Sequence, residues 1–143
     1  MIMQQPGIAE IVRNDPRYAY EAYEFLFEAL GHTQKSLGRA PDEDEIDPGP
    51  QHHVSGPEIL RGACDLAKHE FGLLAKTVFH HWGIRRTDDI GEIIFNLIEA
   101  ELLSRTDSDH RSDFQNVFDI DRALTDGYII EMDEAVLGKR GKR

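Results

Sequence analysis

The stretch TDDIGEIIFNLIEAELL, from Thr87 to Leu103, is the part of the sequence that most clearly decides the fold. Thr87 or Asp89 can cap the free amides at a helix start, and apolar side chains then cover most of the helix circumference. These apolar residues are Ile90, Ile93, Ile94, Phe95, Leu97, Ile98 and Leu102. The polar arc that remains is narrow and consists of Glu92, Asn96 and Glu99. Because a helix that is apolar on most sides is buried, the pattern predicts the central core helix of an all-α protein.

A second helical segment is predicted upstream of this stretch. Ser55-Gly56-Pro57-Glu58 is typical of a capping box, in which the Ser55 hydroxyl and the Glu58 carboxylate each accept a backbone N–H of the other residue. The segment extends to Trp82, and we expect Gly72 to bend it or to split it into two helices. Cys64 lies on its apolar face, which predicts a packed core thiol rather than a nucleophile.

A third helix is predicted from Asp15 to Leu30, with Asp15 as its cap, proline at its first position and Gly31 as its stop. Its acidic residues gather on one narrow arc, and almost every other position is apolar. An ordinary surface helix needs an apolar stripe on one side only. We therefore expect this helix either to be central or to use a second face as an interface, whose candidate residues are Tyr20, Tyr23 and Phe27.

The remaining signals are weaker, and together they predict one domain. A short helix capped by Asp113 and a helical turn near Arg122 are expected, and Tyr128 begins a short apolar run that is either a strand or a strap. We predict an all-α or mainly α fold, a compact bundle of about five helices with a minor extended segment near Tyr128 as an open alternative. The single helical domain covers residues 1–138, with a mobile acidic loop at 39–53 and a disordered basic tail at 139–143.

The charge of the chain argues against some classes of partner. It has 143 residues, 27 acidic against 16 lysines and arginines, and a formal net charge of −11. Such a charge repels phosphate backbones and anionic lipid, so nucleic-acid and membrane surfaces are disfavoured. With a single cysteine, no secretory signal and no apolar run long enough to span a bilayer, a cytoplasmic location is expected.

Two sets of residues are candidates for a site. Asp65 and His69 stand four positions apart on one helix, a spacing that lets two ligands share a metal ion. A pocket is the second hypothesis, formed by His53, Glu70, Thr77, His81 and Trp82. The alternative for both sets is an exposed polar surface, and no recognisable catalytic motif accompanies either.

The order of several short motifs resembles a family of short, uncharacterised proteins of planctomycetes and verrucomicrobia. The motifs are Asp15-Pro16-Arg17-Tyr18, Ser55-Gly56, Phe71-Gly72, Trp82-Gly83-Ile84 and the run from Gly91 to Glu99. The resemblance covers roughly residues 14 to 121 and implies a self-contained unit. Since no activity is assigned to that family, it implies no site.

For function we expect a non-catalytic protein-interaction or structural module that binds a protein partner or associates with itself, without a cofactor. A helix-turn-helix-like protein is one alternative, because two helices joined by a short turn lie between Gly72 and Leu103. In that arrangement the exposed arc would present Glu92 and Glu99 to the phosphates, which argues against DNA. A metal-dependent enzyme or small-ligand binder that uses the helix histidines is the other alternative.

Overall fold

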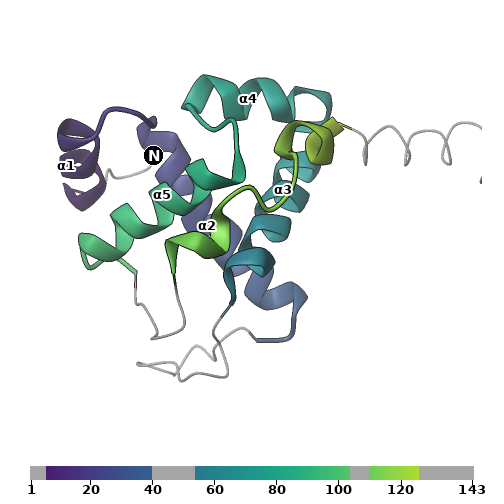
Figure 1. Ribbon diagram of the computed structural model, residues 1–143, viewed down its shortest axis with the longest axis horizontal. Coiled ribbons are helices and arrows are strands. Elements are labelled where there is room, and N and C mark those ends of the chain that lie inside the picture. Colours follow the sequence, from purple (N-terminus) through teal and green to yellow (C-terminus); the bar gives the residue numbers. More distant parts are fainter. Residues whose placement is uncertain (1–5, 40–53, 104–109, 126–143) are drawn as a thin grey trace, which may run out of the picture.

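The computed structural model describes residues 6–39, 54–103 and 110–125, and in these ranges the fold is all-α (Figure 1). The α-helices are α1 (Pro6–Asn14), α2 (Tyr20–Ser36), α3 (Gly56–Phe71), α4 (Ala75–Trp82) and α5 (Thr87–Glu99). Two 3₁₀ turns, η2 (Gly72–Leu74) and η3 (Arg111–Phe114), and a helical segment at 120–125 complete the order. The predicted helical bundle is confirmed. The predicted loop at 39–53, apart from Arg39, and the extended segment near Tyr128 lie outside the described residues.

The predicted start of α2 is wrong, because the helix begins at Tyr20 and not at Asp15. The Asp15 carboxylate accepts hydrogen bonds from the Arg17 guanidinium at 2.9 and 2.7 Å and from the Asn96 side chain at 3.0 Å. These contacts fix residues 15–18 as a turn in front of the helix. The carboxylate therefore joins this turn to α5 instead of capping α2.

The predicted end of α2 is also wrong, since the helix passes through Gly31 and continues to Ser36. Termination occurs at Gly38, whose φ of 71° lies in the left-handed region that glycine adopts most easily. The N–H of Gly38 donates to the Lys35 carbonyl, and the N–H of Arg39 donates to the Gln34 carbonyl. This pair of bonds is the Schellman pattern that satisfies the last carbonyls of a helix.

The capping box at the start of α3 is confirmed. The N–H of Glu58 donates to the Ser55 hydroxyl at 3.3 Å, and the N–H of Ser55 donates to the Glu58 carboxylate at 2.9 Å. The predicted division at Gly72 is confirmed too, with φ at 56° and η2 separating α3 from α4. Gly83 then ends α4 at φ 97°, close beside the Arg17 carbonyl.

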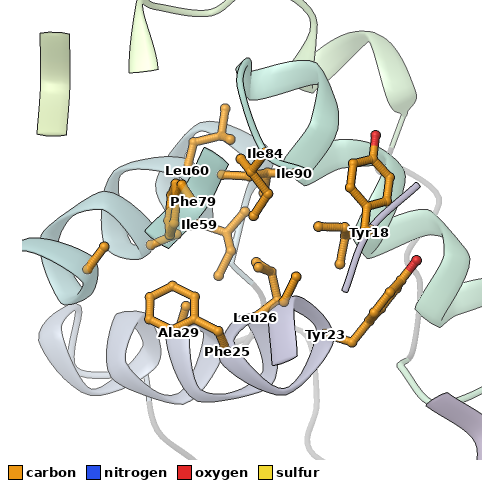
Figure 2. Packing of buried hydrophobic residues seen from close by; sticks show 14 of the residues in the cluster. Tyr18, Tyr23, Phe25, Leu26, Ala29, Ile59, Leu60, Phe79, Ile84 and Ile90 are labelled. Carbon is orange, nitrogen blue, oxygen red and sulfur yellow. The ribbon is translucent and has the colours of Figure 1, made fainter. Parts of the chain in front are cut away.

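The core lies between α2, α3, α4 and α5, and Figure 2 shows side chains of α2 facing those of α3 and α4. The helix α5 contributes Ile90, Ile93 and Leu97, all fully buried, as expected for the central core helix. It ends at Glu99, earlier than the predicted Leu103. An aromatic cluster fills the α2–α4 contact and consists of Phe25, Phe71, Phe79 and Trp82.

The first helix, α1, was not predicted from the sequence. It contacts α2 and α5 and buries Ile8 and Ile11 (Figure 1). Within the described residues, no helix has the length and apolar character needed to cross a membrane.

The segment after α5 closes the other side of the bundle. Phe114 of η3 packs edge-on against Phe95, and a Cβ atom at Gly91 would lie only 2.5 Å from the Phe114 Cβ. The buried Thr87 hydroxyl donates to the Phe114 carbonyl at 2.8 Å and accepts the N–H of Val117 at 3.0 Å. These contacts hold the chain from η3 to residue 125 against α3 and α5, so that residues 117–123 become one wall of a groove.

Candidate functional site

A groove of about 840 Å³ opens between the C-terminal half of α2, the outer side of α3 and residues 117–123. Its volume falls in the range of roughly 300–1,000 Å³ that is typical of ligand-binding clefts. All three walls contribute lining residues: His32, Thr33, Ser36 and Leu37 to the first, Glu58, Arg61, Gly62, Cys64, Asp65 and Lys68 to the second, and Val117, Phe118, Asp119, Arg122 and Ala123 to the third. In Figure 1 the helical segment at 120–125 lies beside α3, below α4.

The bottom of the groove is a close crossing of α2 and α3 at Thr33 and Gly62. A Cβ atom at Gly62 would lie 1.7 Å from the Thr33 hydroxyl oxygen, so only glycine fits this position. Thr33 is buried, and its hydroxyl donates to the Ala29 carbonyl one turn earlier at 2.7 Å. The hydroxyl is thus satisfied within its own helix, and the pair brings the two walls together without leaving an unpaired polar group.

Apolar side chains cover much of the groove surface, and Cys64 is among them. The thiol is buried, as predicted, and burial raises its pKa to about 12. It is therefore protonated at neutral pH, while nucleophilic chemistry requires the thiolate. Cys64 therefore contributes only a small apolar surface to the groove, whose lining also includes Leu37 and Phe118.

The carboxylates that line the groove already have partners within the protein. Glu58 binds the Arg39 guanidinium at 2.7 Å and caps α3, contacts that hold its pKa down at about 2. Asp65 contacts the His32 ring at 3.0 Å across the α2–α3 boundary. Asp119 accepts the N–H of Arg122 at the start of the last helical segment. Glu58 and Asp65 thus connect α3 to the end of α2, whereas Asp119 stabilises the start of a helical segment within its own wall.

Two cations of α3 differ from these carboxylates, because neither contacts an acidic side chain of the described residues. Arg61 lies over the Phe118 ring, with its guanidinium carbon 5.9 Å from the ring centre. Lys68 lies two helical turns further along the same side of the groove. Arg61 is exposed and Lys68 is half-buried. Within the described ranges these two cations of the groove therefore have no carboxylate partner.

The two residues of the predicted metal pair, Asp65 and His69, both lie on α3. Asp65 is directed to His32, and both Asp65 and His69 are exposed. In the part of the chain that the structure describes, no group of three or more histidine, cysteine or acidic side chains is arranged to hold a metal ion.

Four of the predicted pocket residues lie at the end of α3 and along α4. Glu70, Thr77 and His81 are exposed, and Trp82 belongs to the aromatic cluster. None of the four lines the groove, and His53 lies outside the described residues. The exposure agrees with the alternative of an open polar surface. Leu73 and Leu74, at 67% and 63% exposure, mark this side as solvent-facing as well.

The predicted interface residues of α2 are largely covered by the domain itself. Tyr23 is fully buried, and its hydroxyl accepts a hydrogen bond from Asn96 at 3.0 Å. Tyr20 and Phe27 are half-buried and pack against the core. The large apolar surface of α2 thus reflects its central position, which was one of the two explanations of the pattern.

The polar arc of α5, on which the helix-turn-helix alternative depends, makes contacts inside the protein. Glu92 accepts bonds from Arg17 at 3.3 Å and from Arg111 at 2.7 Å. Arg111 also approaches Glu99 at 3.8 Å, and Asn96 binds Asp15 and Tyr23. The arc is part of a polar network that holds the turn before α2 and η3 against α5.

The groove was not predicted from the sequence. Of its key residues only Cys64, Asp65 and Glu58 were singled out, each for another reason. A glycine beside two cations is common on helix surfaces, so the sequence around Arg61, Gly62 and Lys68 does not distinguish a groove wall from an ordinary exposed face. Comparison with known proteins adds no assignment: no family model, no curated protein and no solved structure matches the chain.

Proposed function

We propose that the chain is a non-catalytic protein-interaction module and that the groove between α2, α3 and residues 117–123 receives a segment of a partner protein. The observation that carries the proposal is the groove itself, about 840 Å³ of partly apolar surface with three separate walls. Clefts of this size and lining bury several side chains of a ligand at once.

The chemistry of the groove supports binding over catalysis. The Cys64 thiol is held in its protonated form, and Glu58 and Asp65 already bind Arg39 and His32. A general acid or base must have a proton that it can exchange with a substrate, and a nucleophile needs an adjacent base. Among the described lining residues, Cys64, Glu58 and Asp65 are buried or bound in structural contacts, whereas apolar and cationic side chains of the groove stay exposed.

A matched pair of tryptophan substitutions tests this function. Ser36→Trp adds bulk at an exposed position of the groove wall, and Thr77→Trp adds the same bulk at an exposed position of α4 outside the groove. Peptides are selected from a random displayed library on the full chain, and the affinity of each selected peptide is then measured for both variants. Thermal unfolding checks that both variants are folded.

We expect selected peptides that bind the full chain and Thr77→Trp alike and lose at least about tenfold in affinity for Ser36→Trp. Recovery of no binding peptide, or of peptides that bind both variants equally, would reject the groove as an interaction surface.

A further inference from the structure

Arg61 and Lys68, the two groove cations of α3 without an acidic partner among the described residues, define a spacing. They stand seven positions apart on α3, about 10 Å along the helix at 1.5 Å per residue. A peptide that runs along the groove in an extended form would cover this distance in about three residues, at 3.3 Å each. A helical peptide would cover it in two turns.

Between the cations the groove offers apolar surface together with the exposed carboxylate of Asp65. Cys64 lies on α3 between them in sequence, and Phe118 lies on the third wall, with its ring next to the Arg61 guanidinium. Asp65 is the acidic residue between them, and it contacts His32 rather than either cation. A ligand that places an apolar group on this surface therefore has a cation available on each side of it.

Charge complementarity with Arg61 and Lys68 favours a ligand that carries negative charge. The chain as a whole has a net charge of −11, so a free anion is repelled at a distance. Only a ligand that also gains from the apolar surface can bring its negative charges to Arg61 and Lys68. A small inorganic anion lacks that apolar part, whereas a peptide with carboxylates on both sides of an apolar side chain has it.

We infer that the groove binds an acidic segment of a partner protein, in which two Asp or Glu residues flank at least one large apolar side chain. The carboxylates pair with Arg61 and Lys68, and the apolar side chain lies against Cys64 and Phe118. This inference rests on the proposed function and specifies its ligand.

The test uses the peptides selected on the full chain. Their composition is compared with the starting library, and their affinity is measured for the double variant Arg61→Glu/Lys68→Glu. The control is Lys76→Glu/Arg85→Glu, which makes the same change in net charge at exposed positions outside the groove. Light scattering of each variant reports its oligomeric state.

We expect peptides enriched in Asp and Glu around an apolar residue, with affinity reduced about tenfold or more by the groove reversal and less than about threefold by the control. The affinity should also fall as salt is raised, because charge pairs at a partly exposed groove are screened.

Three outcomes would overturn the inference. Groove-dependent peptides without acidic enrichment, or peptides insensitive to Arg61→Glu/Lys68→Glu, would refute the acidic ligand and leave the proposed function standing. Inorganic phosphate that displaces the peptides at low millimolar concentration would assign the cations to a small anion. Self-association of the chain that Arg61→Glu/Lys68→Glu abolishes would make a second copy the occupant.

Discussion

The contact between Thr33 and Gly62 gives a quantitative test of how the groove is built. In Gly62→Ala, the new Cβ atom would lie 1.7 Å from the Thr33 hydroxyl oxygen and 2.9 Å from the Thr33 Cβ. Since the Thr33 side chain is buried, relief requires a new rotamer that breaks its bond to the Ala29 carbonyl, or separation of α2 from α3. Overpacking of this kind costs about 1–3 kcal/mol.

Gly31→Ala is the matched control, because Gly31 also lies inside a helix but a Cβ atom added there would meet nothing within 4 Å. Both substitutions gain helix propensity, about 1 kcal/mol for glycine to alanine, and this gain cancels in the comparison. We therefore expect Gly31→Ala to stabilise the protein and Gly62→Ala to be about 1–3 kcal/mol less stable than Gly31→Ala.

Urea unfolding followed by circular dichroism at the helix band measures both free energies. A difference of about 2 kcal/mol separates the two midpoints by about 1 M. Adding Thr33→Ala to Gly62→Ala removes the clashing oxygen, so the cost of Gly62→Ala should be smaller in that background. Equal stability of the two glycine variants, or an unchanged cost with Thr33→Ala, would refute the close helix crossing.

Three further predictions concern charge and backbone geometry. Glu70 raises the pKa of Glu28 above its usual 4.5, so the folded state loses stability as pH rises through that raised value. Glu70→Gln should therefore raise the free energy of unfolding by a few tenths of a kcal/mol at pH 7 and leave it unchanged below pH 4.5, as measured by urea titration. The guanidinium of Arg17 holds the pKa of Asp15 well below its usual 3.8, so this carboxylate stabilises the fold above that pH. Asp15→Asn should lower the free energy of unfolding by about 1 kcal/mol at pH 7, and its difference from wild type should shrink below pH 3.8. A difference that stays constant with pH would contradict the ion pair. Gly83→Ala should lower the free energy of unfolding by more than about 2 kcal/mol, because φ is 97° and the new Cβ would lie 2.3 Å from the Arg17 carbonyl oxygen. A thermal unfolding curve equal to that of wild type would rule out this close contact.

Local chemistry explains which parts of the fold were predictable from the sequence. The capping box of Ser55 and Glu58, the interruption at Gly72 and the helix end at Trp82 depend mainly on neighbouring residues, and all of them were predicted. The burial of α5 followed from its apolar circumference in the same way.

The predicted start and end of α2 were wrong because residues distant in sequence decide the local structure there. Asp15 has the chemistry of a helix cap, but Asn96 of α5 and the adjacent Arg17 take its carboxylate. Gly31 has the chemistry of a helix stop, but the helix continues so that Thr33 can pack on Gly62 of α3. Long-range packing of this kind leaves no signal in a local window of sequence.

The groove was not predictable for the same reason. It needs the crossing of α2 and α3 and also the return of residues 117–123 along α3, which the buried Thr87 hydroxyl fixes through Phe114 and Val117. From the sequence, α2 was instead expected to offer an interface at Tyr20, Tyr23 and Phe27. Since Tyr23 is buried against Asn96, the apolar surplus of α2 serves the core.

Amide chemical-shift perturbation on the isotope-labelled full chain locates where a selected peptide binds and so tests the groove directly. If the groove receives the peptide, perturbations gather at the C-terminal half of α2, on the Arg61–Lys68 side of α3 and along residues 117–123. Perturbations that gather on α5 and η3 instead, with the groove amides unchanged, would contradict the proposed site.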